Sequence, residues 1–475
     1  MTLIKSISGI RGTIGGVAGK NLTPIDIVKF SSSFASMLQK RGGGADSGNI
    51  TMVVGRDGRV SGNMVKQLVI STLQGMGVNV IDVDLSTTPT VEMEVVRHKA
   101  QGGIIITASH NPKEWNALKL LGSNGEFISA DEGAEVLRLS DDGTVQFAPV
   151  TELGTVQTVN DGLKKHIEKI LSLPAVSVAD IKKANFKIVV DGINSTGGAA
   201  ISELLHALGV MEVTVLNGEP NGNFAHNPEP LPENLTQISE EVVKQKADMG
   251  IVVDPDVDRL CFVCGDGTMF GEEYTLVAVA DYILGKTKGA VVSNLSSSRA
   301  LRDVAEKYKC ECYSSAVGEV NVVAKMKEVN AVLGGEGNGG VIYPELHYGR
   351  DALVGTALFL TALSLRGNGG GSDNGGISEK SLTKWRSELP QYVISKNKIS
   401  LRENTDIDAL LEMLKTHFAA EKINITDGVR IDFEQTKEWV HLRRSNTEPI
   451  IRIYAESATS EKAGILVGLI TDLLN

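Results

Sequence analysis

The sequence predicts an α/β protein made of several domains. Short runs rich in β-branched residues alternate with amphipathic helical stretches through most of the chain, which is the pattern of parallel sheets covered by helices. The chain has 475 residues, of which 42% are hydrophobic and 22% charged, the balance of a compact folded protein. At roughly 150 residues per domain, this length fits about three domains and accommodates four.

Strand and helix signals follow one another along the chain. A helix is expected to begin at Thr23-Pro24, because a capping residue precedes a proline in the first turn. The strand-like run at 51–55 leads through a polar loop to a helical stretch at 64–76. The first helix should place on one face Ile27, Phe30, Phe34 and Leu38. Further strand-like runs lie at 102–107, 187–192, 211–216, 249–254, 289–294 and 330–335.

The C-terminal part has a different pattern. The segment 366–376 is a flexible loop by composition. It is followed by strand-like patches (VRIDF, WVHLRR and RIYAES) and by a predicted helix over 460–474, which together indicate a smaller α+β domain. That helix is apolar at Ile465, Leu466, Leu469 and Leu473.

The net charge of −11, from 47 Lys and Arg against 58 Asp and Glu, restricts the partners of the protein. It argues against nucleic acid, which needs a broad basic face, so a bound anion must meet a local cluster of cations. No stretch approaches the roughly 18 apolar residues of a membrane span, and the N-terminal residues lack the apolar core of a signal peptide. We therefore expect a cytoplasmic protein without a membrane partner.

Four cysteines suggest a zinc site as one alternative. Cys261 and Cys264 lie in an apolar run, where a strand would point them to opposite faces. Cys310 and Cys312 are not spaced like the ligands of a zinc ribbon. Reduced, buried thiols are the favoured interpretation.

An acidic loop follows the run at 249–254, with Asp254, Asp256 and Asp258 at alternate positions. Carboxylates that converge in a tight turn repel one another unless a hard cation lies between them, and oxygen-only ligation suits Mg²⁺ or Ca²⁺. An EF-hand is excluded, because Arg259 stands where that loop needs Gly and Gly265 where it needs Glu. The alternative is a solvated acidic turn.

A second polar loop, TASHNP, contains Ser109 and His110. The Ser109 hydroxyl would project from the carboxyl end of a strand, although the sequence is not the GxSxG elbow of a serine hydrolase. His110 would orient or neutralise a phosphate there. A turn-forming Ser-His pair is the alternative.

A third loop, GGEGNGG, carries Glu336 and Asn338 and lacks the Lys-Ser/Thr pair of a Walker sequence. These side chains can accept and donate hydrogen bonds to vicinal sugar hydroxyls, and a flexible turn is the alternative. Ligands bind at the carboxyl ends of the strands in open parallel sheets. The three loops would therefore form one site if they faced a common cleft.

Arginines supply the candidate anion-binding groups. In RRSNTEPIIR, Arg443 and Arg452 bracket a turn whose hydroxyl and N–H donors match a phosphate dianion. That turn contains Ser445, Asn446 and Thr447. Three more arginines stand in glycine-rich turns of the first domain, where they would either steady a phosphate on Ser109 or pair with acids: Arg11, Arg56 and Arg59.

Five segments, in this order and across nearly all of the chain, resemble motifs of the α-D-phosphohexomutases: SGIRG, TASHNPKEWNALK, DPDVDR, GEGNGG and RRSNTEP. This superfamily includes phosphoglucomutase, phosphomannomutase and phosphoglucosamine mutase. The resemblance implies four domains around a central cleft, three related α/β units and a C-terminal α+β domain that closes over the substrate. The expected ranges are 1–155 with the phosphoserine loop, 156–264 with the metal loop, 265–390 with the sugar loop and 391–475 with the phosphate loop.

The resemblance also implies residue roles. Ser109 matches the phosphorylated serine, whose phosphate joins three aspartates in binding Mg²⁺, and Lys119 matches a candidate acid or base. Arg11 and His110 match catalytic positions near the phosphoserine. The aspartates are Asp254, Asp256 and Asp258. The residues expected to bind the substrate are Arg259, Glu336, Asn338, Arg443, Ser445, Asn446, Thr447 and Arg452.

The implied reaction moves a phosphoryl group between O6 and O1 of a hexose phosphate. Phospho-Ser109 would donate to the free hydroxyl, giving a hexose 1,6-bisphosphate that also serves as activator. The intermediate would turn over before Ser109 takes back the other phosphate. The partner is then a phosphosugar, and the protein is expected to be a monomer or homodimer.

Departures from the family motifs bear on the substrate. Asn338 and Gly340 stand where the GExSGH motif of bacterial members has Ser and His. Ala117 stands where a Gly often follows the Asn of the motif SHNPxxxNG. GEGNGG with SNTEP resembles the archaeal-type phosphoglucosamine mutases, and in part the eukaryotic acetylglucosamine-phosphate mutases, so glucosamine phosphate is favoured over mannose and glucose phosphates. A non-catalytic phosphosugar sensor and a metal-dependent phosphatase are the alternatives of other kinds.

Overall fold

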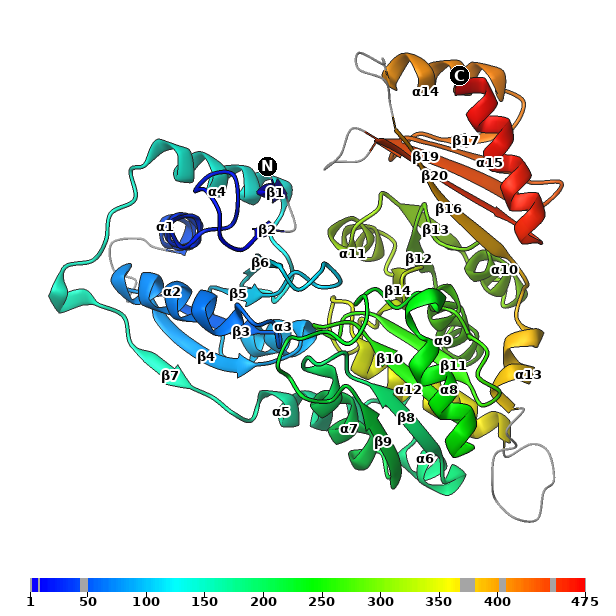
Figure 1. Ribbon diagram of the computed structural model, residues 1–475, viewed down its shortest axis with the longest axis horizontal. Helices are drawn as coiled ribbons and strands as arrows, with labels where there is room; N and C mark the ends of the chain where they lie inside the picture. Colours follow the sequence, from blue (N-terminus) through cyan, green and yellow to red (C-terminus); the bar gives the residue numbers. More distant parts are fainter. Residues whose placement is uncertain are drawn as a thin grey trace. The chain divides into compact units, whose positions relative to one another are not determined.

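The computed structural model describes residues 2–6, 9–42, 50–367, 381–400, 407–444 and 450–474. It divides into two compact units, whose elements are labelled in Figure 1. The first unit consists of residues 1–272 and 340–383, and the second of residues 273–339 and 384–475. The chain therefore leaves the first unit, returns to it once and ends in the second.

The first unit begins with a mixed sheet of seven strands. Across the sheet these are β1 (Ile4–Ser6), β2 (Gly9–Thr13), β6 (Trp115–Gly122), β5 (Gly102–Ile106), β3 (Thr51–Arg56), β4 (Asn79–Leu85) and β7 (Val156–Thr158). β5, β3, β4 and β7 pair in parallel, whereas β6, β2 and β1 are added antiparallel. The carboxyl end of β5 therefore lies beside the carboxyl end of β3.

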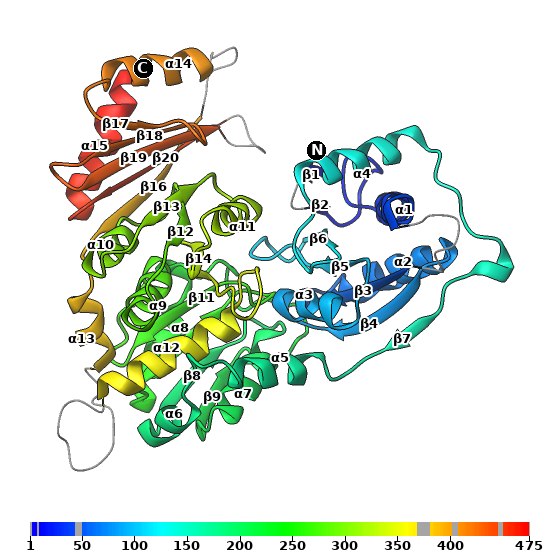
Figure 2. The ribbon, with the colours of Figure 1, turned by 180° about the vertical axis from the view of Figure 1, so that it is seen from behind.

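Helices cover both faces of this sheet (Figures 1 and 2). One face packs against α1 (Pro24–Gly42), α2 (Gly62–Gly75) and α4 (Ala130–Asp142), and the other against α3 (Thr88–Arg97). The strand residues alternate accordingly, with Val54 and Ile104 on the first face and Val53 and Ile105 on the second. The predicted apolar face of α1 is confirmed, because all four of its members are buried: Ile27, Phe30, Phe34 and Leu38.

The second sheet of the first unit has four strands. In order they are β11 (Leu260–Cys264), β10 (Met249–Val253), β8 (Lys187–Asp191) and β9 (Glu212–Leu216), with only β11 antiparallel. Its helices are α5 (Gly162–Leu171), α6 (Val178–Ala184), α7 (Gly197–Ala207), α8 (Thr236–Gln245) and, from later in the chain, α12 (Ala352–Gly367). Short 3₁₀ turns lie at Val150–Glu152 and Pro232–Asn234. Every residue of β10 is buried, and the strand ends directly before Asp254.

The second unit contains a parallel sheet in which β12 (Val291–Asn294) lies between β13 (Cys312–Ser315) and β14 (Leu333–Glu336). Its helices are α9 (Glu272–Lys286), α10 (Ala300–Lys307) and α11 (Glu319–Glu328). The short strand β15 (Gly340–Ile342) marks the return to the first unit. Glu336 is thus the last residue of a buried strand.

The C-terminal part of the second unit is an antiparallel sheet preceded by α13 (Ser381–Glu388). Its strands are β16 (Val393–Ser400), β20 (Ile450–Ser457), β19 (Glu438–Arg444), β18 (Val429–Phe433) and β17 (Lys422–Asn424). One face packs against α14 (Ile407–His417) and α15 (Ser460–Leu474). Of the apolar residues noted in α15, Leu466 and Leu473 pack against this core, whereas Ile465 and Leu469 are exposed.

The fold class predicted from the sequence is confirmed. Three sheets with parallel strands and covering helices, and one antiparallel C-terminal sheet, are present in the described part of the chain. None of the helices described is both long enough and apolar enough to cross a membrane.

Candidate active site

Ser109 lies three residues beyond β5, in a strained turn. Its φ is +49°, the left-handed region that non-glycine residues seldom adopt. The Thr107 hydroxyl accepts from the Ser109 N–H at 2.9 Å, and the Ser109 hydroxyl donates to Asp254 Oδ2 at 2.7 Å. Strain of this kind persists only where the surrounding contacts hold it in place, and it is concentrated at functional sites.

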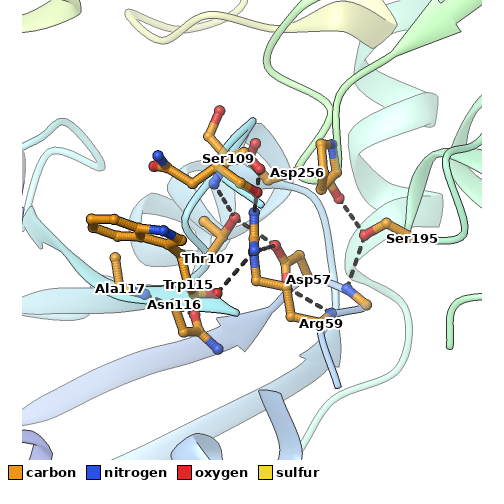
Figure 3. Close-up of polar contacts among 12 residues, drawn as sticks. Asp57, Arg59, Thr107, Ser109, Trp115, Asn116, Ala117, Ser195 and Asp256 are labelled. Carbon is orange, nitrogen blue, oxygen red and sulfur yellow. Dashed lines mark hydrogen bonds and ion pairs between the residues drawn. The ribbon is translucent and has the colours of Figure 1, made fainter. Parts of the chain in front are cut away.

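Arg59 provides those contacts (Figure 3). Its side chain is fully buried, and its Nε pairs with Asp57 Oδ2 at 3.1 Å. Asp57 Oδ2 also accepts from the Thr107 hydroxyl at 2.7 Å. The two terminal nitrogens of the guanidinium donate to four backbone carbonyls of the serine loop: those of Ser109, Asn111, Pro112 and Trp115. Arg59 therefore holds the loop backbone together from inside.

The structure distinguishes the roles of Arg11, Arg56 and Arg59, which the sequence leaves undecided. Arg59 is committed to Asp57 and to carbonyls, and Arg56 pairs with Asp84 at 2.9 Å. Burial and then the positive charge of Arg259 lower the pKa of Arg11, on β2, and the charge of Arg11 in turn contributes to lowering the pKa of His110. Arg59 therefore braces the serine loop, whereas Arg11 adds positive charge near His110.

The acidic loop is buried rather than solvated. Asp254, Asp256 and Asp258 each have no solvent exposure, and one carboxylate oxygen from each lies within 4.8 Å of those from the other two. Val257 between them has a φ of +62°, a genuine outlier for a β-branched residue. Asp254 Oδ1 accepts from the N–H groups of Asp258 and Arg259, each at 3.1 Å. The loop is therefore wrapped around the Asp254 side chain.

The carboxylates of this loop carry unbalanced charge. Burial raises the pKa of Asp254 well above its usual value, and repulsion from Asp258 and Asp256 adds to that rise. Burial would also raise the pKa of Asp258, but Arg350, Lys119 and Arg259 lower it below its usual value. Oδ1 of Asp256 and Oδ1 of Asp258 are buried without a hydrogen-bond partner in the described chain. An all-oxygen donor set with two unpartnered oxygens fits a hard divalent cation.

Cations surround the same carboxylates. Lys119 Nζ lies 2.7 Å from Asp256 Oδ2 and 3.4 Å from Asp258 Oδ2, and Arg350 donates to Asp258 Oδ2 at 2.7 Å. Burial would lower the pKa of Lys119, but the two aspartates raise it above its usual value, so the amine is protonated. Arg259 Nε lies 3.9 Å from Asp254 Oδ2. The acidic chain thus has a local cluster of cations beside Ser109.

His110 adjoins this cluster. Its Nδ1 lies 3.3 Å from Ser109 Oγ. Burial, followed by the positive charges of Arg259, Arg11 and Arg350, lowers its pKa well below the usual value, although Asp258 acts in the opposite direction. His110 is therefore a neutral imidazole at neutral pH, able to donate or accept a single proton beside the serine.

Several contributors to the site were not singled out in the sequence. Arg350 follows a Tyr-Gly pair and gives no motif of its own. Ser195 accepts from the Gly58 N–H at 2.9 Å and donates to the Pro255 carbonyl at 2.6 Å, which joins the Arg59 turn to the acidic loop (Figure 3). Thr88, at the start of α3, donates to Asp256 Oδ2 at 2.6 Å. Only their positions in the fold reveal these contacts.

The loop around Glu336 in the second unit, predicted to bind the sugar, is a fixed structure rather than a flexible turn. Glu336 is buried, and its Oε1 accepts from Asn294 Nδ2 at 2.7 Å and from the Gly318 N–H at 3.1 Å. Asn338 Nδ2 lies 3.4 Å from Glu336 Oε2. A Cβ at Gly337 would lie 1.8 Å from Glu273 Oε2, so a larger residue there would have to displace the Glu273 carboxylate.

The predicted phosphate loop is described only at its two ends. Arg443 on β19 and Arg452 on β20 are direct cross-strand partners, and Lys398 on β16 is the next partner of Arg452. Like charges directly opposite one another are unfavourable unless an anion offsets them. One counter-ion is Asp427, 3.3 Å from Arg443. The residues predicted between the strands, Ser445, Asn446 and Thr447, lie outside the described residues.

Comparison with known families decides the class. The models of phosphoglucomutase/phosphomannomutase α/β/α domains I, II and III match residues 4–145, 164–267 and 271–390, and the model of the C-terminal domain matches residues 397–470. The chain is a member of the phosphoglucomutase/phosphomannomutase family. The resemblance inferred from the five sequence motifs is thereby confirmed.

Several relatives within this phosphohexomutase family match over almost their full length. A phosphoglucomutase/phosphomannomutase of Thermococcus kodakarensis is 35% identical, with 95% of each chain covered. A probable phosphoglucosamine mutase of Methanopyrus kandleri is 32% identical, with 96% of this chain and 94% of the relative covered. A phosphoglucosamine/phosphogalactosamine mutase of Sulfurisphaera tokodaii is 30% identical, with coverages of 96% and 97%.

A solved structure confirms the shared phosphohexomutase fold. A phosphoglucomutase/phosphomannomutase family protein of Burkholderia thailandensis superposes with a TM-score of 0.81 at 23% identity, covering 99% of this chain and 98% of the other.

The cysteines do not contribute to a metal cluster among the described residues. All four are free thiols, and neither metal-capable cluster in that part of the chain includes one. Cys261 and Cys264 are buried in β11, as predicted, whereas Cys312, the first residue of the edge strand β13, and Cys310, two residues before it, are only half-buried.

We expect Arg59→Lys to destabilise the first unit even though the positive charge is kept. Lysine cannot reach four carbonyls and Asp57 together, and each lost charge-assisted bond costs roughly 1.5–3 kcal/mol. The free energy of unfolding, measured by urea denaturation, should fall by about 3 kcal/mol or more. Arg56→Lys is the matched control, because its partner Asp84 is exposed, and it should cost less than about 1 kcal/mol. Equal losses in the two variants would contradict the bracing role of Arg59.

Proposed function

We propose that this protein is a phosphohexomutase that interconverts hexose 6-phosphate and hexose 1-phosphate through phospho-Ser109 and a hexose 1,6-bisphosphate. The observation that carries the proposal is the 2.7 Å hydrogen bond from the Ser109 hydroxyl to Asp254, within a buried carboxylate cluster ringed by cations. A phosphoryl group on this hydroxyl would stand between the carboxylates and the cations. Phosphoryl transfer requires little beyond such positioning and charge stabilisation.

Asp254, Asp256 and Asp258 would hold Mg²⁺, with an oxygen of the serine phosphate as a further ligand. The ion would supply positive charge to the oxygens of the transferring group. The unpartnered oxygens of Asp256 and Asp258 support this assignment. Arg11 and Arg259 would bind the remaining phosphate oxygens from the other side.

Proton transfer is assigned to Lys119 and His110. Each phosphoryl transfer takes a proton from the attacking hydroxyl and gives one to the leaving oxygen. Because Lys119 is held protonated by two aspartates, it suits the donor half of this exchange. His110 is neutral and lies beside Ser109 Oγ, so it would accept the Ser109 proton in the second transfer, in which this hydroxyl attacks, and return it to Ser109 Oγ when that oxygen leaves in the first transfer of the next cycle.

The second unit would supply the groups that recognise the substrate. Glu336, oriented by Asn294, and Asn338 would bind sugar hydroxyls. Arg443 and Arg452 would bind the phosphate that does not react, and the facing cations support this role. The sequence between these arginines contains the further predicted phosphate ligands, Ser445, Asn446 and Thr447.

Glucosamine phosphate is the substrate we favour. The loop residues Asn338 and Gly340 follow the phosphoglucosamine mutase pattern, and relatives named for that activity match nearly the whole chain. Mannose and glucose phosphates are the second candidates, because a relative at 35% identity is named phosphoglucomutase/phosphomannomutase.

We expect Ser109→Ala to abolish interconversion while leaving the fold and substrate binding intact, since only one small hydroxyl is lost. A coupled assay would follow turnover, and isothermal titration would follow binding of the 6-phosphate. Ser123→Ala, at an exposed turn, is the matched control and should retain full turnover. Turnover by Ser109→Ala would rule out the phosphoserine route.

Rates on glucosamine, mannose and glucose phosphates, measured side by side with 1,6-bisphosphate activator, should be highest for glucosamine phosphate. Net release of inorganic phosphate should be negligible. Release at a rate comparable to turnover would indicate a phosphatase, and binding without turnover on all three sugars would indicate a sensor.

Arg443→Ala should raise the KM for the hexose phosphate by about tenfold to a hundredfold, because a charge-assisted contact worth roughly 1.5–3 kcal/mol is lost. The control is Arg444→Ala, the exposed neighbour whose side chain points to the other face of the same strand. An unchanged KM in Arg443→Ala would show that this arginine does not bind the substrate phosphate.

A further inference from the structure

A second cluster of ligand-type side chains lies in the first unit, separate from the aspartate loop. It consists of His166 on α5, His347 in the segment between β15 and α12, and Asp351 directly before α12. The candidate ligand atoms of all three lie within 4.8 Å of one another. The side chains of His166 and Asp351 are fully buried, and that of His347 is 13% exposed.

The two histidines converge on one oxygen. His166 Nε2 lies 2.8 Å and His347 Nε2 3.2 Å from Asp351 Oδ2. The other oxygen, Asp351 Oδ1, is already used, because it accepts from the N–H groups of Leu353 and Val354 at the start of α12. The two Nε2 atoms and Asp351 Oδ2 therefore form a compact, buried donor set, in which each nitrogen either donates a proton to that oxygen or, without its proton, shares a metal ion with it.

The far side of each ring is also held. His166 Nδ1 lies 2.9 Å from the Thr90 hydroxyl, and His347 Nδ1 lies 3.3 Å from Glu92 Oε2. Metal-binding histidines usually have the second ring nitrogen hydrogen-bonded to a carboxylate or another polar group, which fixes the tautomer and the ring orientation, and His166 meets this pattern through Thr90. Here Nε2 of both rings is left to face Asp351.

Two buried carboxylates flank the histidines. Glu92 and Asp351 have side-chain exposures of 2% and 0%. A divalent ion bound by neutral imidazoles would place two positive charges beside these carboxylates, and buried carboxylates are stabilised by a bound metal ion.

We propose that His166, His347 and Asp351 form a binding site for a divalent transition metal of the zinc type, distinct from the Mg²⁺ loop. Two imidazole nitrogens and one carboxylate oxygen are a donor set that suits Zn²⁺ or Co²⁺ and not Mg²⁺, and a water molecule would complete the coordination. The site would fasten together α3, α5 and the segment before α12. Two of these elements also contact the aspartate loop, through Thr88 to Asp256 and through Arg350 to Asp258.

The test uses the full-length, untagged protein stripped with a chelator and then titrated with Co²⁺ in excess Mg²⁺, which occupies the aspartate loop. We expect one Co²⁺ per chain, with the strong visible absorption of a four- or five-coordinate, histidine-ligated ion, and its displacement by Zn²⁺. His347→Gln should lose this absorption. His98→Gln, which alters another carboxylate-paired histidine of the same unit, should retain it.

A measurement on the wild-type protein keeps the test decisive if His347→Gln does not fold. Proton NMR of the Co²⁺ form should show two exchangeable, paramagnetically shifted imidazole N–H signals, one from each ligand histidine. Absence of Co²⁺ binding in excess Mg²⁺, an unchanged spectrum in folded His347→Gln, or a Co²⁺ form without these signals would overturn the proposal. The cluster would then be an ion pair centred on a protonated His347.

Discussion

Three carboxylates buried within one turn repel one another, and the architecture around Ser109 depends on how that repulsion is offset. Lys119 and Arg350 reach the aspartates from other segments, and Asp254 takes the Ser109 hydroxyl as a partner. Two carboxylate oxygens nevertheless remain without hydrogen bonds in the described chain. A divalent cation beside a phosphorylated serine would resolve this imbalance, because it would bring positive charge to the carboxylates while the arginines meet the phosphate.

This arrangement requires strained backbone conformations, which the fold of the first unit stabilises. Ser109 and Val257 both adopt left-handed backbone conformations, which are unfavourable for residues with side chains. Arg59 and Ser195 hold the two strained turns through hydrogen bonds to backbone groups. Their donor groups are used in these bonds and do not bind substrate. In the second unit, hydrogen bonds likewise fix a predicted site residue: the Glu336 carboxylate accepts from Asn294 and from the Gly318 N–H.

The sequence predicts the fold class, the strands that end at the site and the residues whose chemistry is concentrated in short motifs. DPDVDR and TASHNP could be interpreted because their acidic and hydroxyl groups are adjacent in the chain. Arg350, Ser195 and Asn294 could not, because their importance lies in partners far away in sequence; Arg350 and Asp258, for example, are 92 residues apart. The sequence also does not show which of Arg11 and Arg59 steadies a phosphate and which pairs with an acid, because both stand in similar glycine-rich turns.

Peptide mapping of the phosphorylated protein tests the central claim most directly. The purified enzyme would be incubated with a hexose 1,6-bisphosphate and Mg²⁺, digested, and analysed by tandem mass spectrometry. The account predicts a single phosphate, on Ser109, that is replaced by a labelled phosphoryl group when the enzyme then turns over a hexose phosphate carrying ¹⁸O in its phosphate. Phosphate on another residue, or a Ser109 that stays unmodified while the enzyme turns over, would contradict it.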